Sequence, residues 1–391
     1  MAQVAWIAAV GGLLAIVYVL LGYPLLMALW AALRPYPETR DAALAQPSFS
    51  IFLVCYNEEK VLPAKLDSLA NLAYPPDLVE YLLADDGSSD GTRALLEAFC
   101  QRPDIAGRAR LVEPIGNTGK PTQVNRMVPM SRGDILLFND ARQPLSPGSL
   151  KALAEVLSDP RVGGGTGAVE YRPADGAPVM VGGYWRYESA IRVWESAAHS
   201  CTSGAGPLMC CRRELYRPMP EALVLDDILT PIRVVLAGKR FVYVPEAVAV
   251  ETFVMDPRHE FRRRVRNSAG VIQAIRSDLR TLVPWRNPVW LQFWSHKCGR
   301  LAMPFLLAAV LLGSVLGLGL HPFFGWLLAA QAAFYAYAGL GWLTAESRWS
   351  PPGSRLALSL VMLALVVLGG FHRELRGVTT AAWGSDETRR R

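Results

Sequence analysis

The chain has 391 residues, which is long for one domain and suggests two regions. Hydrophobic residues make up 51% and charged residues only 19% of it, which is apolar for a soluble enzyme. The six cysteines have no Cys-x-x-Cys pair and no metal-type spacing, so we expect cytoplasmic free thiols rather than a zinc site.

The formal net charge is +6, and much of it is local. Arg262, Arg263, Arg264 and Arg266 form one basic run. Nucleic-acid binding is the generic interpretation of such a run, but beside membrane segments phosphate and anionic lipid are better partners. We therefore expect membrane lipids and no nucleic acid among the partners.

Uncharged segments near both ends predict membrane crossings. Residues 4–33 carry no charged side chain, and this length crosses about 30 Å of hydrocarbon as a tilted helix. A signal peptide is the alternative, but its apolar region would be shorter and its start basic. Residues 301–320 and 323–344 are also long enough to span. Residues 356–371 are near the short limit and fit either a crossing or an interfacial segment.

Basic residues beside these segments orient the middle of the chain. Arg34 and Arg40 follow the first segment, and Lys297 and Arg300 precede the second. The positive-inside rule then predicts a multi-pass protein of the inner or plasma membrane with its middle region in the cytoplasm. Three further crossings would put the basic tail outside, and this conflict stays open. The basic residues of the tail are Arg373, Arg376 and residues 389–391.

The same features divide the chain into five parts. Residues 262–282 keep an apolar face beside basic positions, and residues 284–300 are rich in tryptophan, so both are candidates for the membrane surface. We predict a membrane anchor at 1–33, a cytoplasmic domain at 34–260, interfacial helices at 261–300, transmembrane helices at 301–372 and a basic tail at 373–391.

Strands and helices alternate between residues 50 and 140. Apolar runs predict strands at 50–55, 78–84, 110–112 and 135–138, and helical spacing predicts helices at 61–70, 92–100 and 122–128. This alternation predicts an α/β fold, a parallel sheet with helices on both faces. Beyond it, we expect a Gly-rich strand at 162–172 and a helix at 185–198.

Polar residues follow these strands. Tyr56-Asn57-Glu58 follows the first strand, Asp85-Asp86-Gly87-Ser88 the second, Gly119-Lys120 the third, and Asp140-Ala141-Arg142 the fourth. Because parallel strands place their carboxyl ends at one edge, these residues are expected to share one crevice. Capping of turns and helices is the alternative for the acids.

In this order, the motifs resemble those of family 2 glycosyltransferases. The matching residues are Tyr56-Asn57-Glu58, Asp85-Asp86-Gly87-Ser88, Gly119-Lys120, Asp140 and Asp226-Asp227. The resemblance covers about residues 48–270. With its flanking membrane helices, the chain is similar to the branch that includes cellulose, hyaluronan and poly-N-acetylglucosamine synthases. It implies a Rossmann-like, nucleotide-sugar-binding domain of the GT-A type.

The resemblance also implies how a donor would bind. Tyr56 and Glu58 would hold uridine, because a flat ring stacks on a flat base, and Asp85 and Asp86 would lie near the base or ribose. Lys120 would meet a phosphate as a point charge. An ordinary turn tyrosine and a solvated lysine are the alternatives for Tyr56 and Lys120.

Asp140 matches the first acid of the metal-binding Asp-x-Asp element. Mg²⁺ or Mn²⁺ held there would bridge the diphosphate oxygens and stabilise the leaving nucleotide. The third position is Arg142 instead of a second acid. A phosphate and an acid are the two partners expected for Arg142, and its presence leaves room for a noncatalytic descendant.

The pair Asp226-Asp227 matches the acids that carry the catalytic base. Transfer with inversion needs a carboxylate near the acceptor hydroxyl, and the resemblance assigns this role to Asp227, with Asp226 as a supporting residue or helix cap. A helix N-cap pair is the alternative. Gly204 and Gly206 lie in a tight loop that borders the acceptor sugar in relatives.

Residues 260–266 stand where synthases carry Gln-x-x-Arg-Trp. Arg264 matches the arginine that would neutralise the diphosphate, whereas Val265 replaces the tryptophan. Since that tryptophan supports the acceptor chain in processive enzymes, we expect a single transfer.

The sequence thus predicts a membrane-bound inverting glycosyltransferase, metal-dependent and acting in envelope or exopolysaccharide synthesis. It would move a sugar from a nucleotide-diphosphate sugar, with a UDP-sugar favoured, to a lipid-linked or polysaccharide acceptor. One alternative is transfer to polyprenyl phosphate. Another is a catalytically silent, sugar-nucleotide-binding scaffold subunit.

Overall fold

The computed structural model describes residues 1–40, 46–172, 182–252, 257–344 and 350–383. The chain divides into two compact units. The first comprises Met1–Leu26, Arg263–Ala269 and Leu291–Gly377. The second comprises Met27–Arg262, Gly270–Trp290 and Val378–Arg391. The predicted basic residues 389–391 lie outside the described residues.

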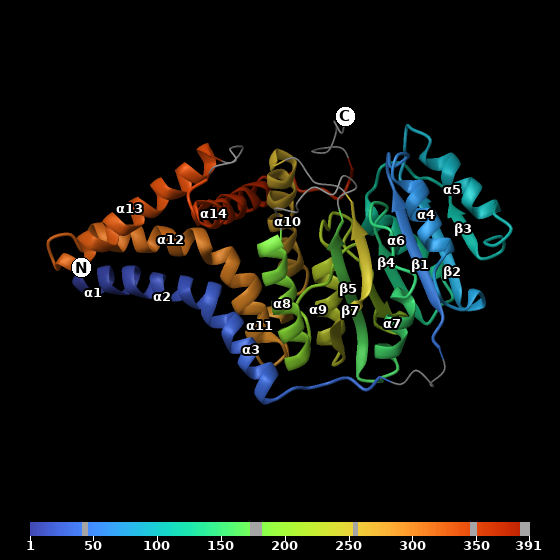
Figure 1. Cartoon of the computed structure of the whole chain (residues 1–391), viewed down its shortest axis with the longest axis horizontal. Helices are drawn as coiled ribbons and strands as arrows, with labels where there is room; N and C mark the ends of the chain where they lie inside the picture. The colour runs from blue at the N-terminus through green and yellow to red at the C-terminus, as the bar shows by residue number, and fades with distance from the viewer. Residues whose placement is uncertain (41–45, 173–181, 253–256, 345–349, 384–391) are drawn as a thin grey trace. The chain divides into compact units, whose positions relative to one another are not determined.

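The second unit is built on a mixed sheet (Figure 1). In the described residues, seven strands lie in the order β3-β2-β1-β4-β6-β5-β7. β1 to β4 are parallel, β6 runs antiparallel to both β4 and β5, and β5 is parallel to β7. The strands are β1 (Phe49–Cys55), β2 (Val79–Asp85), β3 (Ala109–Val112), β4 (Ile135–Asn139), β5 (Val162–Tyr171), β6 (Leu208–Arg212) and β7 (Arg240–Glu251).

Helices pack on both faces of this sheet, so the predicted α/β fold is confirmed. The helices of this unit are α4 (Leu62–Ala70), α5 (Thr92–Gln101), α6 (Lys120–Met127), α7 (Ser149–Leu157), α8 (Gly182–Ala198) and α9 (Asp226–Leu236). α4, α5 and α7 share an apolar core with Ile51 and Leu53 of β1. On the opposite face, Phe52 stacks on Phe138 at 5.6 Å, and Phe138 contacts Tyr216, whose hydroxyl donates to Asn125 of α6.

The strand register brings the predicted site residues to one edge of the sheet. Cys55, the last residue of β1, pairs with Asp85 at the end of β2. Leu53 of β1 pairs with Asn139 at the end of β4. Tyr56, Asp86 and Asp140 therefore leave the sheet at the same edge, as the motif order predicted.

The glycines of β5 allow close packing against its two neighbouring strands. β5 lies between β6 and β7, and a Cβ atom on Gly164 would be 2.6 Å from the carbonyl oxygen of Cys210 and 2.9 Å from the Phe241 ring. A side chain at this position would push on backbone, which cannot yield as a flexible side chain can.

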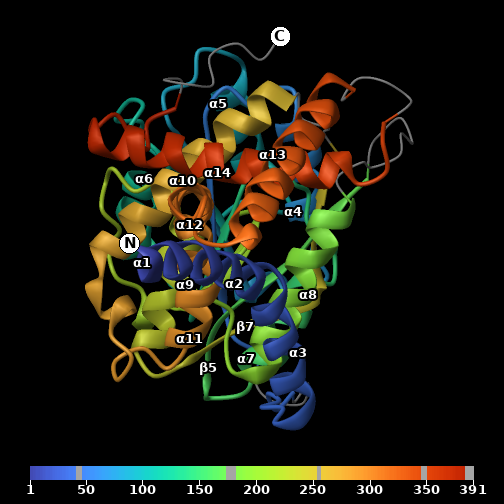
Figure 2. The ribbon, with the colours of Figure 1, turned by 90° about the vertical axis from the view of Figure 1, so that its left-hand side faces the viewer.

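The first unit consists of apolar helices (Figure 2). Four helical spans among the described residues are long and apolar enough to cross a membrane, which suggests membrane association. They are Ala2–Leu33, Trp290–Leu316, Pro322–Leu343 and Ser354–Leu375. These spans contain α1 (Ala2–Trp6), α2 (Gly12–Val17), α3 (Tyr23–Leu33), α11 (Trp290–Gln292), α12 (Gly299–Leu316), α13 (Pro322–Leu343) and α14 (Ser354–Leu375). A further helix, α10 (Pro257–Ser277), precedes the last three of these spans.

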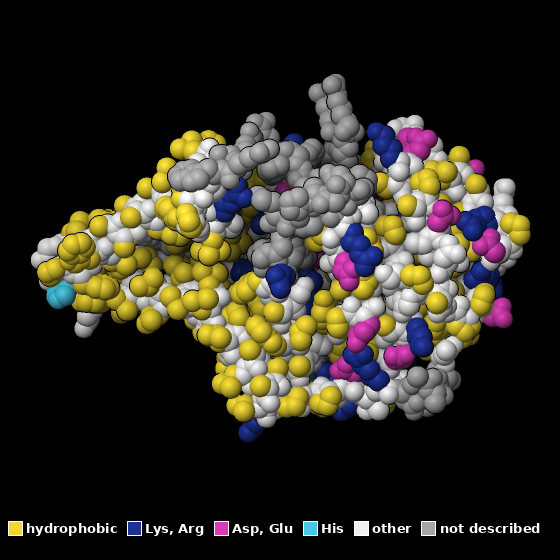
Figure 3. Space-filling view, in the orientation of Figure 1, with side chains coloured by type: hydrophobic (Ala, Val, Ile, Leu, Met, Phe, Trp, Pro, Cys, Tyr) yellow, Lys and Arg dark blue, Asp and Glu magenta, His cyan; other side chains and the backbone are white. Residues whose placement is uncertain are grey.

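The last of these spans is longer than the sequence suggested. α14 has 22 residues instead of the predicted 16 at 356–371, because helical geometry continues through His372, Arg373 and Glu374. It therefore has enough length to cross. Small residues let the helices of this unit approach closely: a Cβ on Gly341 would be 2.5 Å from the Ser354 carbonyl oxygen. Hydrophobic side chains dominate the visible surface of these helices (Figure 3).

We predict that Gly164→Ala lowers the free energy of unfolding by about 1–3 kcal/mol, because the added methyl group overpacks the sheet. Denaturant unfolding of the full chain in detergent measures this difference. Gly148→Ala is the control, since a Cβ at Gly148 meets no heavy atom within 4 Å. Equal losses in the two variants would contradict the assignment.

Candidate active site

The loops that follow β1 and β2 are tied together. The N–H of Asn57 donates to the Ser88 hydroxyl at 2.9 Å, and the N–H of Ser89 donates to the Asn57 side-chain oxygen at 2.8 Å. Asn57 has a positive φ of 53°, a conformation that asparagine tolerates better than most residues. These bonds fix the chain on either side of Tyr56 and Glu58.

Asp86 anchors the segment that carries Lys120. Its carboxylate is fully buried and accepts hydrogen bonds from the backbone N–H groups of Thr118 (3.0 Å) and Gly119 (2.7 Å), and from the Gln123 side chain (2.7 Å). Asp85 accepts from the N–H of Ser88 at 3.1 Å. Both acids thus bind backbone groups of their own chain, and their role toward a nucleotide stays a prediction.

Lys120 joins two of the predicted acids. Its ammonium nitrogen lies 2.8 Å from Oδ1 of Asp140 and 3.1 Å from Oδ2 of Asp226. Asp140 follows β4, and Asp226 begins α9, so this ion triad connects three elements of the sheet unit. Burial by itself lowers the pKa of Lys120, but the carboxylates of Asp140 and Asp226 outweigh it and raise the pKa above the ordinary lysine value.

Arg142 pairs with an acid, which is one of its two predicted partners. Its Nε donates to both carboxylate oxygens of Glu58, at 3.0 and 3.2 Å. The residue in place of a second metal-binding acid therefore joins the loop after β4 to the loop after β1. This pair also holds Glu58 next to Arg142. The predicted contact of Glu58 with uridine stays untested.

The acceptor-side loop packs against the acids. The N–H of Gly204 donates to the carbonyl oxygen of Asp227 at 2.6 Å, and a Cβ on Gly206 would be 3.3 Å from Oδ2 of Asp140. The N-cap residue of α9 is Leu225, so Asp226 and Asp227 both lie within the first helical turn. Arg264 lies in α10 and belongs to the first unit, and its predicted contact with the diphosphate stays a prediction.

The sequence did not reveal that the C-terminal segment, Val378–Trp383, belongs to this site. Trp383 stacks on Tyr56 with ring centroids 6.4 Å apart and an interplanar angle of 12°. The N–H of Trp383 donates to the Asn117 side chain at 2.7 Å, and that side chain donates back to the Trp383 carbonyl. A Cβ on Gly119 would be 2.5 Å from the Ala381 carbonyl oxygen. No local motif marks this segment, because its partners lie more than 260 residues away.

Lys65 is a second residue that sequence reasoning missed. It is fully buried on α4, and its ammonium donates to the carbonyl oxygen of Gln143 at 2.7 Å, just beyond Arg142. Burial lowers the pKa of Lys65 to about 7, against a smaller opposing effect of Asp140. A lysine at a helical apolar position, next to Leu62, Leu66 and Leu69, was the available signal.

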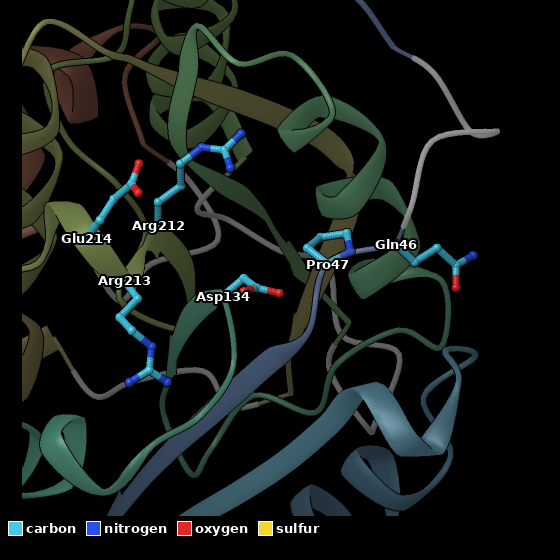
Figure 4. A pocket seen from close by; sticks show the side chains of 6 residues that line it. All are labelled: Gln46, Pro47, Asp134, Arg212, Arg213 and Glu214. Atoms are coloured by element: carbon cyan, nitrogen blue, oxygen red, sulfur yellow. The ribbon is translucent and has the colours of Figure 1, made fainter.

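A hollow of about 430 Å³ lies at the other end of the sheet (Figure 4). It is lined by Gln46, Pro47, Asp134, Arg212, Arg213 and Glu214. Pro47 precedes β1 and Asp134 precedes β4, so the hollow lies at the amino ends of these strands. It is therefore separate from the residues that the motifs single out.

The carboxylate oxygens beside Lys120 suit a divalent cation but supply only part of the ligands that it needs. Oxygens of Asp140 and Asp226 point at one position, now held by the Lys120 ammonium. The described residues contain no group of three or more His, Cys, Asp or Glu side chains arranged around a metal position. Two carboxylates suit Mg²⁺ or Mn²⁺, which takes its other ligands from water and substrate phosphates.

Sequence comparison identifies the family. The sequence model of Glycosyl transferase family 2 matches residues 50–216, and that of Glycosyl transferase family group 2 matches residues 135–370. The chain belongs to glycosyl transferase family group 2. The matched residues include Lys120, Asp140, Asp226 and Asp227.

The curated relatives of this chain are distant. A probable glycosyltransferase of Bacillus subtilis (strain 168) is 24% identical over 247 residues, which are 61% of this chain and 58% of that protein. An N-acetylglucosaminyltransferase of Rhizobium sp. (strain N33) is 26% identical over 52% of this chain and 48% of its own. A beta-monoglucosyldiacylglycerol synthase of Trichormus variabilis is 26% identical over 48% and 39%. The chain thus spans about half the length of these relatives.

A solved structure supports the fold. The mannosyltransferase of Pyrobaculum calidifontis, solved in complex with GDP-Man and Mn²⁺, superposes with a TM-score of 0.73 at 22% identity. The match covers 96% of this chain and 98% of that one. The predicted GT-A-type fold is confirmed.

We predict that Asp86→Asn lowers the free energy of unfolding by about 1–3 kcal/mol. The new amide places a donor among N–H groups that now donate to this carboxylate. Thermal unfolding in detergent measures the loss, and Asp77→Asn, at an exposed acid, is the control. A loss no larger than in the control would argue against Asp86 as the anchor.

We also expect Lys65 to make stability depend on pH. Its pKa in the folded protein, about 7, lies below its ordinary value of 10.5, so the unfolded chain binds more protons between these values. The free energy of unfolding of the wild type relative to Lys65→Met should therefore rise with pH in this window, by up to about 1.4 kcal/mol per pH unit. Parallel pH profiles of the two proteins would contradict this.

Proposed function

We infer that this protein is a membrane-bound inverting glycosyltransferase that uses a nucleotide-diphosphate sugar, with a UDP-sugar favoured. The acceptor is a lipid-linked or polysaccharide glycan of the cell envelope. The observation that carries the proposal is the ion triad of Asp140, Lys120 and Asp226, which lies at the carboxyl edge of the parallel strands next to Asp227 in the chain. This edge is where open α/β sheets bind nucleotides.

Tyr56 is the proposed contact for the base of the nucleotide-sugar donor. Its ring, held between loops that are themselves tied together, offers a stacking surface for a flat base. Because Trp383 stacks on that ring, a base must either displace Trp383 or use the other face. The mannosyltransferase neighbour was solved with GDP-Man, so guanosine donors belong beside uridine donors in any assay.

Asp227 is the proposed base. Its carboxylate takes the proton of the acceptor hydroxyl while the acceptor oxygen attacks the anomeric carbon. The bond from this carbon to the diphosphate breaks on the opposite face, and the nucleoside diphosphate leaves with its electron pair. The configuration at the anomeric carbon is inverted. Asp227 lies in the first turn of α9, whose partial positive charge favours the ionised carboxylate.

Charge on the leaving diphosphate needs a cationic partner. Mg²⁺ or Mn²⁺, bound by Asp140 and Asp226, would supply Lewis-acid stabilisation there. Lys120 is the protein's own cation at this position, and Arg264 is a further candidate. Asp86 and Gly119 fix the backbone from which Lys120 extends.

Two observations support an acceptor at the membrane. The described chain carries four apolar spans, and a curated relative is named as a beta-monoglucosyldiacylglycerol synthase. Val265, in place of the tryptophan of processive synthases, favours a single transfer. The proposed cytoplasmic side of the inner or plasma membrane rests instead on the basic residues beside the apolar spans, which are Arg34, Arg40, Lys297 and Arg300.

Transfer to polyprenyl phosphate is a second candidate. A dolichyl-phosphate beta-glucosyltransferase of Mus musculus is 30% identical over 129 residues, 32% of this chain. Product analysis on lipid extracts separates a lipid-linked monosaccharide from an extended glycan. A silent scaffold subunit would bind donor without turnover.

We predict that full-length protein in detergent releases nucleotide from one donor of a panel of UDP-, GDP- and dTDP-sugars, with Mg²⁺ or Mn²⁺ and lipid extract. Asp227→Asn should reduce transfer on the order of 10²–10⁴-fold, as expected for loss of a general base. Asp140→Ala should reduce transfer and raise the metal concentration needed for half-maximal activity, because one of the two proposed carboxylate ligands is gone.

Asp77→Asn, an exposed acid far along the chain from both variants, is the matched control and should keep full activity. Full turnover by Asp227→Asn would remove Asp227 as the base. If the proteins of the set bound donor and none of them turned it over, the scaffold subunit would be favoured instead.

A further inference from the structure

The ammonium of Lys120 occupies the position where two carboxylates could bind a cation. Its nitrogen is 2.8 Å from Oδ1 of Asp140 and 3.1 Å from Oδ2 of Asp226. A divalent ion such as Mg²⁺ binds carboxylate oxygens at about 2.0–2.1 Å. A metal ion that bridged these two oxygens would occupy the position of the ammonium, so the two cations cannot hold that position at once.

Burial makes this competition strong. The side chains of Lys120 and Asp226 are only 13% and 11% exposed, so water screens their charges weakly. Two acids that approach one point repel each other unless a cation lies between them. Lys120 therefore supplies, within the chain, the compensation that a metal ion would otherwise provide.

The local structure lets the ammonium leave without moving the backbone. Thr118 and Gly119, just before Lys120, are hydrogen-bonded to the buried carboxylate of Asp86. The side chain beyond this fixed point is a flexible four-carbon stem with a compact charge at its end. Arg142, by contrast, is held away from Asp140 by both oxygens of Glu58.

We propose that Lys120 is an internal counter-ion that competes with a divalent cation for Asp140 and Asp226. Metal binding requires the ammonium to swing out, and the departing ammonium becomes available to the diphosphate. The apparent affinity for metal is then the intrinsic affinity of the two acids multiplied by the fraction of molecules in which Lys120 is not paired with them. The inference rests on the proposed function only in treating these acids as the cation site.

The test is a titration with Mn²⁺ alone, without nucleotide or acceptor, followed by electron paramagnetic resonance of the free ion. Full-length wild type, Lys120→Gln and Lys151→Gln are compared in detergent. Lys120→Gln should bind Mn²⁺ at least about tenfold more tightly than wild type, because the competing ammonium is gone. Lys151→Gln, at an exposed lysine of α7, should bind as the wild type does. Equal or weaker binding by Lys120→Gln would overturn the proposal.

A second measurement needs no variant. Lysine acetylation of the wild-type protein, read by mass spectrometry, reports how accessible each amine is. Saturating Mn²⁺ should speed the modification of Lys120 severalfold and leave Lys151 unchanged. A Lys120 rate that stays the same or falls with Mn²⁺ would overturn the proposal, even if Lys120→Gln did not fold. Since neither test involves a sugar donor, failure of the proposed transfer reaction would leave both results interpretable.

Discussion

Two carboxylates that approach one point require a cation between them, and this requirement organises the candidate active site. Asp140 comes from the end of β4 and Asp226 from the start of α9, 86 positions later. Lys120, at the start of α6, satisfies both at once. The triad therefore fixes α6 and α9 relative to the edge of the sheet. The buried Asp86, by binding the backbone before Lys120, makes this arrangement depend on β2 as well.

The missing acid after β4 changes the connections of the site more than its charge. A second aspartate at position 142 would have added negative charge beside Asp140. Arg142 instead neutralises Glu58 and links the loops that follow β1 and β4. Lys120 pairs with Asp140 and Asp226. The two basic side chains, Arg142 and Lys120, therefore neutralise different carboxylates. The described residues consequently offer two ligands to a metal ion, which leaves most of its coordination sphere to water and substrate.

The sequence revealed those parts of the fold whose signals are local. The apolar runs of β1, β2 and β4 predicted buried strands, and parallel geometry predicted that Tyr56, Asp86 and Asp140 would meet. β6 and β7 were not predicted individually, although the apolar residues Leu208–Cys211 and Phe241–Val244 are typical of buried strands. The partners of Asp86, Lys120 and Arg142 could not be predicted either, since each is chosen by side-chain direction in three dimensions. Trp383 escaped notice because stacking across more than 300 residues has no sequence signature.

The contact between Tyr56 and Trp383 links the completion of the site to the order of synthesis. All strands of the described sheet have been made once Glu251 has left the ribosome. Trp383 is made only after α12, α13 and α14, three apolar helices that are long enough to cross a bilayer. During translation, the ring of Tyr56 therefore lacks its stacking partner Trp383 until the final apolar helix has been synthesised. A nascent chain stalled before that point would carry all strands of the described sheet without the ring that stacks on Tyr56.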